Sequence, residues 1–161
     1  MRNKPEAEPI KTKATPGLTA KVRLSIALVS FLLFAFCFQL SCTRSDPKFK
    51  QYYNQGEELY ITHCSNCHQK NGKGLGRIYP PLDSSDFLNN NFNQVICLMK
   101  NGMRGSILVN GKEFNQAMPG VSALSDLEVA EIATYIYNTW DNKRGLVDVK
   151  EVSPILGSCK E

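Results

Sequence analysis

The stretch ITHCSNCHQK, residues 61–70, constrains this chain most, because it holds both of the chain's histidines and two of its six cysteines. Cys64, Cys67 and His68 fit the pattern C-x-x-C-H, which is typical of covalent haem attachment. Two intervening residues let the two thiols reach two vinyl groups on one edge of a porphyrin. The histidine that follows then lies under the ring and can bind the iron. The pattern therefore predicts one haem c, attached at Cys64 and Cys67 and ligated by His68.

Two other kinds of site use paired cysteines. A structural zinc site needs about four ligands, whereas Cys64, Cys67 and one histidine supply three. The sequence has no second C-x-x-C and no H-x-x-x-H. A thioredoxin-like dithiol belongs in a βαβ context, whereas the residues before Cys64 have helical spacing. We therefore favour haem attachment. His63 directly precedes Cys64, and we interpret it as a surface histidine at a helix end.

Residues 1–41 have the pattern of an export or lipoprotein signal, or of a membrane anchor. Basic residues come first, and the uncharged apolar run LSIALVSFLLFAFCFQL follows at residues 24–40. Ser41-Cys42 after this run resembles a bacterial lipoprotein signal, which is cleaved before a cysteine that then carries lipid. We expect the protein to be exported to the periplasmic side of the membrane and anchored by lipid at Cys42. Two alternatives to the lipid anchor stay open: an uncleaved N-terminal helix that serves as the anchor, and a simple signal that is cleaved off.

The charge distribution argues against nucleic-acid binding. The formal net charge is +4, from 19 basic and 15 acidic residues. Residues 1–41 hold six of the basic residues and two of the acidic ones, which leaves 13 of each sign in residues 42–161. A balanced domain lacks the basic surface that binds phosphates.

We divide the exported part into a tether at residues 42–48, a main domain at residues 49–152 and a C-terminal tail at residues 153–161. Apolar spacing predicts a helix over residues 48–63 and one or two short helices over residues 85–100. A capping box at Ser125-Asp126-Leu127-Glu128 predicts a further helix that runs to Trp140. Ile107-Leu108-Val109-Asn110-Gly111 predicts a local β-hairpin.

These elements predict an all-α fold with long loops and one small hairpin. A dozen or so large apolar side chains make a thin core for about 120 residues. Long loops around a thin core indicate that a cofactor fills the middle.

Residues 49–152 resemble a class I monohaem cytochrome c, which implies three to five helices wrapped around one covalently bound haem. Gly56 and Tyr60 match the family's small and aromatic residues where the first helix crosses the last. Pro80 matches a proline whose carbonyl accepts a hydrogen bond from Nδ1 of the proximal histidine, and such bonds orient a ligand. Leu82 matches a leucine that packs on the haem.

The methionines Met99, Met103 and Met118 are candidates for the second iron ligand. Met99 falls in a helical pattern, where methionine is usually part of the core. Met103 follows a turn, and Met118 precedes Pro119, which stiffens an extended segment. Ala117-Met118-Pro119-Gly120 resembles the family's distal methionine segment, so Met118 is the predicted ligand and Met103 the reserve. An iron with both axial ligands favours electron transfer over catalysis.

Two cysteines, Cys97 and Cys159, remain once the other four are assigned to the leader, to lipid attachment and to haem attachment. In an oxidising compartment two such thiols can form a disulfide. The alternative is a buried Cys97 and a free terminal thiol at Cys159. The sequence leaves both open.

The resemblance implies an electron carrier rather than an enzyme, with redox proteins as its partners. It would pass electrons from a donor complex to a terminal respiratory reductase or oxidase. VNGKEFNQAMPG and LSDLEVAEIATYIYNTW resemble small cytochrome modules that accompany copper-dependent respiratory enzymes. Two alternatives stay open: a haem-based sensor or binder of small ligands, and a cytochrome subunit of a larger oxidase or dehydrogenase complex.

Overall fold

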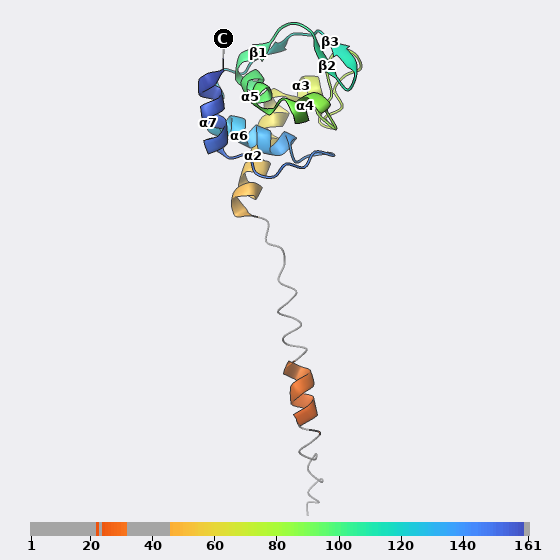
Figure 1. The fold of residues 1–161 in the computed structure, drawn as a ribbon, viewed down its shortest axis with the longest axis vertical. Coiled ribbons are helices and arrows are strands. Elements are labelled where there is room, and N and C mark those ends of the chain that lie inside the picture. Colours follow the sequence, from red (N-terminus) through yellow and green to blue (C-terminus); the bar gives the residue numbers. More distant parts are fainter. Residues whose placement is uncertain (1–21, 23, 32–45, 160–161) are drawn as a thin grey trace, which may run out of the picture. The chain divides into compact units, whose positions relative to one another are not determined.

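A computed structural model describes residues 22, 24–31 and 46–159 of the chain (Figure 1). The chain divides into two compact units, residues 1–43 and 44–161. In the first unit, residues 24–31 are helical and their side chains are exposed. Among the described helices, none has both the length and the apolar character needed to span a membrane. The predicted lipid site Cys42, and with it most of the leader and tether, lies outside the described residues.

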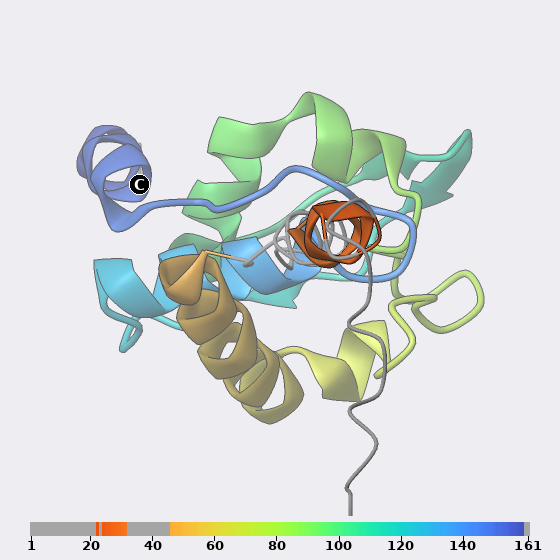
Figure 2. The ribbon, with the colours of Figure 1, turned by 90° about the horizontal axis from the view of Figure 1, so that it is seen from below.

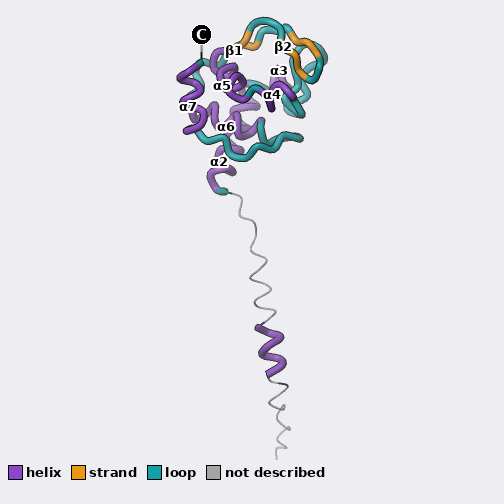
Figure 3. The backbone as a smooth tube through the Cα atoms, viewed as in Figure 1, coloured by secondary structure: helices purple, strands orange, loops and turns teal. Residues whose placement is uncertain are grey.

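The second unit is built mainly from helices, which confirms the predicted all-α fold class (Figures 1 and 3). Its elements in chain order are α2 (Pro47–His63), α3 (Ser65–His68), α4 (Asp86–Asn90), α5 (Phe92–Asn101), β1 (Gly102–Met103), β2 (Ile107–Val109), β3 (Lys112–Phe114), β4 (Met118–Pro119), α6 (Asp126–Ile136) and α7 (Val149–Ser158). The core lies among α2, α5, α6 and α7 and includes Tyr60, Ile96, Ile132 and Val152.

The crossing of α2 and α6 is the most extensive helix contact among the described residues. The Asp46 side chain caps α2 by accepting from Lys48 N, and a capping box between Ser125 and Glu128 begins α6. A Cβ atom at Gly56 would overlap the carbonyl group of Glu131, so only glycine fits this contact without a shift. Figure 2 shows α2 passing across α6. The expected crossing at Gly56 is confirmed.

Helix α6 ends at Ile136, so the expected extension to Trp140 is wrong. Side-chain amides draw the chain out of the helix beyond this point. Asn142 Nδ2 donates to the carbonyl of Ile136 at 2.9 Å, and Asn138 Nδ2 donates to that of Thr134 at 2.7 Å. Such local bonds compete with the helical ladder. Trp140 then adopts a positive φ of 57° and packs its ring against those of Tyr60 and Tyr135.

Helix α7 was not predicted, and it continues through much of the segment that the sequence analysis took as a tail. Pro154 lies inside it, and proline removes a helical hydrogen bond, so the sequence pattern is weak. Packing against α6 and α5 stabilises the helix instead, with Val152 fully buried.

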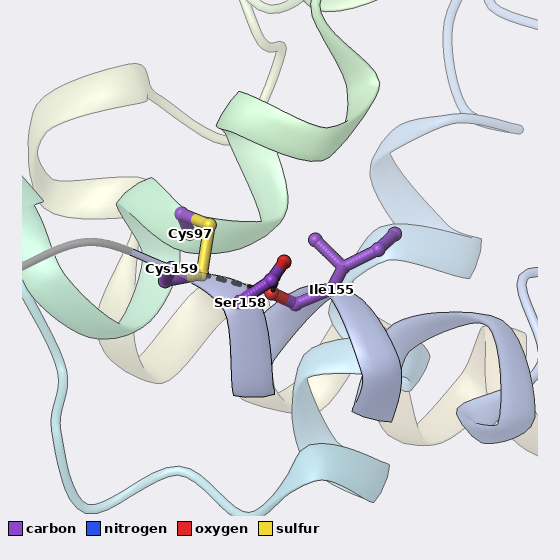
Figure 4. The surroundings of a disulfide bond; sticks show 4 residues. All are labelled: Cys97, Ile155, Ser158 and Cys159. Atoms are coloured by element: carbon purple, nitrogen blue, oxygen red, sulfur yellow. Dashed lines mark hydrogen bonds between the residues drawn. A yellow bond between two sulfur atoms is a disulfide. The ribbon is translucent and has the colours of Figure 1, made fainter.

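The structure decides between the two alternatives for the remaining cysteines. Cys97 on α5 and Cys159 at the end of α7 form a disulfide (Figure 4).

Two short antiparallel ladders complete the domain. The predicted hairpin is confirmed as β2 paired with β3, and Asn110 and Gly111 both have the positive φ that its turn requires. The second ladder, β1 with β4, was not predicted. It pairs Gly102 with Pro119 and Met103 with Met118. The two methionines are 15 residues apart in the chain.

Candidate functional site

The C-x-x-C-H residues lie at the junction between α2 and α3. His68 N donates to Cys64 O at 3.0 Å, which places these two residues one helical turn apart on the same side of the chain. Within the described part of the chain, Cys64 and Cys67 are the cysteines outside a disulfide. Burial, and then the nearby Cys67 sulfur, raise the pKa of the Cys64 thiol to about 11. A neutral Cys64 thiol therefore stands beside a buried imidazole.

The imidazole of His68 is held by a backbone carbonyl. His68 Nδ1 donates to Pro80 O at 3.0 Å, which confirms the hydrogen bond expected at Pro80. Burial lowers the pKa of His68, and the bond to Pro80 partly opposes this shift. In the described structure no hydrogen bond occupies Nε2. The ring is therefore neutral, carries its proton on Nδ1, and has a free lone pair on Nε2.

The loop between His68 and Leu82 is folded back so that Pro80 reaches the histidine. Gly74 N donates to His68 O at 3.0 Å, and Leu82 N donates to Gly72 O at 2.7 Å. Gly72 and Gly74 both have positive φ, and a Cβ at either would overlap its neighbours. The glycines that mark this loop in the sequence thus let it close tightly under the imidazole.

The site residues surround an apolar cavity in the middle of the domain, called here the central cavity. Cys64, His68 and Met118 contribute to its wall, together with Leu82 and Met99. The remaining lining is Tyr60, Pro80, Pro81, Ser85, Phe87, Leu88, Val95, Leu98, Ile107, Val109, Ile132 and Ile136. A second cavity, the loop cavity, shares His68 and Met118 with it and is also lined by Cys67 and Met103.

This lining fits a haem. The cavity wall is almost wholly apolar, as suits a porphyrin, and the Cys64 thiol and the His68 imidazole lie in it. Thiols, an imidazole and a thioether are the groups that attach and ligate haem c. In the described residues no cluster of three or more His, Cys, Asp and Glu could hold a bare metal ion instead.

The other candidate residues are placed differently. His63 is exposed at the end of α2, as expected, although it lies on the rim of a further pocket that includes His68. Met99 is buried in the core on α5. The loop cations Lys70, Lys73 and Arg77 are exposed.

Asn142 is a residue whose role sequence reasoning missed. Its buried side chain donates to Leu82 O at 3.0 Å as well as to Ile136 O, so it ties the loop after Pro80 to the end of α6. The signal available was an asparagine shortly after a predicted helix, which is a common stop signal. Its second acceptor is 60 residues away and has no local signature.

Comparison with known proteins agrees with this geometry. The family model described as cytochrome c matches residues 53–140, which is more than half of the chain. The chain belongs to the cytochrome c family. It therefore carries covalently bound haem c and serves in electron transfer. The class I resemblance and the cofactor predicted from C-x-x-C-H are confirmed.

Among similar proteins is cytochrome c-552 of Thermus thermophilus, 29% identical over 93 residues, which cover 55% of this chain and 70% of that protein. Another is the cytochrome c subunit of a quinone alcohol dehydrogenase from Gluconobacter oxydans. It is 29% identical over 106 residues, or 63% of this chain, but the match spans only 22% of the subunit.

Proposed function

We propose that Cys64 and Cys67 attach the haem and that His68 and Met118 ligate its iron. The observation that carries this proposal is that His68 and Met118 line one apolar cavity, with Nδ1 of His68 bound to Pro80 and Nε2 left free. The haem supplies a one-electron couple at its iron. With His68 and Met118 both bound to it, the iron would have no position for a substrate, so these residues would support electron transfer without bond-making chemistry.

The polypeptide sets the properties of the site through its own groups. Pro80 accepts the Nδ1 proton, which fixes the tautomer and the ring orientation and raises the basicity of Nε2. Leu82, Ile132 and Ile136 exclude water from the cavity. A water-free surrounding disfavours the ferric haem, which carries one more positive charge than the ferrous haem. A methionine ligand favours the reduced state. We therefore expect a comparatively high reduction potential.

The partners proposed are an electron donor complex and a terminal respiratory reductase or oxidase. Exposed cations in the loop after His68, namely Lys70, Lys73 and Arg77, support a partner with an acidic docking face. Such charges act mainly on the association rate and weaken with added salt. A second candidate function is service as the cytochrome subunit of a dehydrogenase complex, which the match to the quinone alcohol dehydrogenase subunit favours.

We propose that the protein works on the periplasmic side of a membrane, with residues 1–41 as signal or anchor, residues 42–48 as tether and lipid on Cys42. The basic and then apolar leader and the Ser41-Cys42 pair support this. An anchor raises the effective concentration of a carrier near its partners. Blocking lipoprotein signal cleavage in cells is expected to enlarge the mature protein, and an unchanged size would contradict lipidation.

The ligand assignment is tested with haem-loaded protein. We expect one haem that stays attached on a denaturing gel, and a ferric spectrum with the near-infrared band of methionine ligation. Met118→Leu should change that band and lower the reduction potential, whereas Met103→Leu should leave both as in wild type. If Met103→Leu changes the potential and Met118→Leu does not, the assignment of Met118 is wrong.

The two functions are separated by purification from native membranes. A carrier is expected to be recovered alone and to exchange electrons with an oxidase or reductase in solution. Recovery in a stable stoichiometric complex with a dehydrogenase would favour the subunit role instead.

A further inference from the structure

Met103 and Met118 stand opposite each other in the β1–β4 ladder. They are the directly paired residues of this antiparallel register. Side chains of directly opposed residues project to the same face of a ladder, with Cβ atoms about 5 Å apart. The two thioethers are therefore presented to one side of the ladder.

That side faces the haem site. Met103 and Met118 both line the loop cavity, whose wall also includes Cys67 and His68. Both methionines are half-buried, so neither side chain belongs to the buried core and neither is fully exposed to solvent. Met99 differs, because it is a buried core residue on α5 and does not line the loop cavity.

The ladder keeps the two methionines in register. Gly102 and Gly120 approach so closely that a Cβ on either would overlap backbone atoms of the other strand segment. Val121 N donates to Met99 O at 2.9 Å just beyond the ladder. The backbones are therefore fixed against each other, and the two methionine side chains are the parts left to move. Methionine, with its flexible unbranched side chain, suits such a move.

We propose that Met103 is a second distal thioether, which replaces Met118 on the haem iron when Met118 is lost or oxidised. This inference rests on the ligand assignment proposed above. In the exchange one sulfur–iron bond breaks and another forms, with no net electron or proton transfer, because a thioether has no proton to release. The site thus keeps both axial ligands, and electron transfer survives damage to Met118.

The first test compares haem-loaded Met118→Leu, Met103→Leu and the double variant. We expect Met118→Leu to retain a near-infrared band, at a shifted position, and to resist carbon monoxide in the ferrous state. The double variant should lose the band and bind carbon monoxide. Circular dichroism of each variant checks that the fold is intact.

Several results would overturn the inference. Loss of the band in Met118→Leu, with carbon monoxide binding equal to that of the double variant, shows that Met103 does not reach the iron. A low-spin Met118→Leu protein without the band indicates a nitrogen ligand instead. A band that persists in the double variant points to Met99. The first two results leave the assignment of Met118 standing, whereas a band unchanged in the double variant, or an altered potential in Met103→Leu alone, would remove it.

A second test needs no folded Met118 variant. Wild type and Met103→Leu are treated with limiting peroxide, which converts a thioether to its sulfoxide and is itself reduced to water. Mass spectrometry measures sulfoxide at Met118. At equal oxidation of Met118, the band should persist in wild type and disappear in Met103→Leu. Equal loss in both proteins would contradict the proposal.

Discussion

The helical side and the loop side of the central cavity are built on different principles. On the helical side, α2 and α6 meet backbone to backbone at Gly56 and Glu131, and buried side chains such as Tyr60 and Ile132 fill the contact. On the loop side, residues 69–82 and 102–121 carry Pro80 and Met118 on turns and on strands of two or three residues. The helical side sets where the cavity is, and the loop side sets which atoms face into it.

This difference teaches that stability and tuning are separated in the molecule. Changes on the helical side act through close packing, which tolerates little added volume. Changes on the loop side act through single polar contacts, each of modest free energy. We therefore expect the free energy of unfolding to respond mainly to the helical side and the reduction potential mainly to the loop side.

The largest effect is expected at the helix crossing. Gly56→Val places a branched side chain where even a Cβ overlaps the carbonyl of Glu131, so the helices must separate. We expect a loss of about 3 kcal/mol or more in the free energy of unfolding of the haem-loaded protein. Denaturant unfolding followed by circular dichroism measures it. Asn54→Ala, on the exposed face of α2, is the control. If Gly56→Val lowers the free energy of unfolding by less than removal of the Cys97–Cys159 disulfide does, the helix crossing is not the main determinant of stability.

The disulfide between α5 and α7 comes next. It closes a separation of 62 residues, and replacing Cys97 and Cys159 together by serine removes that constraint. We expect a loss of about 2–3 kcal/mol. Thermal unfolding with and without a thiol reductant measures the effect. The reductant should destabilise wild type but not the variant, since thioether bonds to haem resist it. Equal sensitivity of the two proteins would contradict a role for this bond.

Asn142 links the two sides, and its replacement tests their separation. Asn142→Ala leaves the carbonyls of Leu82 and Ile136 without their buried donor. We expect a loss of about 2 kcal/mol in the free energy of unfolding, together with a shift in reduction potential, because Leu82 follows the loop that holds His68. Lys143→Ala, an exposed neighbour, should change neither. A stability loss with an unchanged potential would show that Asn142 does not position the loop.

The smallest effect is expected at the start of α6. Ser125→Ala removes the capping box with Glu128 and should cost about 1 kcal/mol at neutral pH. Hydrogen bonds from the backbone and side chain of Ser125 lower the pKa of Glu128 below its ordinary value of 4.5. A lowered carboxyl pKa stabilises the fold above the ordinary value, and that stability is lost as pH falls through the lowered pKa.

The difference between wild type and Ser125→Ala should therefore shrink as the pH falls below about 4.5. Unfolding curves at a series of pH values measure this trend. Ser122→Ala, which changes an exposed serine outside the helix, serves as the control. A difference that stays constant with pH would assign the effect to helix propensity rather than to the Glu128 carboxylate.

Much of the fold was readable because its signals are local. The capping box at Ser125, the Asn110-Gly111 turn and the C-x-x-C-H run each act over a few residues. The end of α6 and the whole of α7 were misjudged because their causes are distant. Asn142 reaches Leu82 across 60 residues, and α7 depends on burial of Val152 and a bond to Cys97. No short window of sequence contains such contacts.

The sequence by itself determined the cofactor, because the C-x-x-C-H run acts over five residues, and its resemblance to class I cytochromes c implied the hydrogen bond between His68 and Pro80. Only the tertiary structure decided which thioethers meet at the site. Met103 and Met118 are brought together by a two-residue ladder between glycine-flanked segments. That pairing depends on how the two loops fold back on α5, and no local pattern around either methionine specifies it.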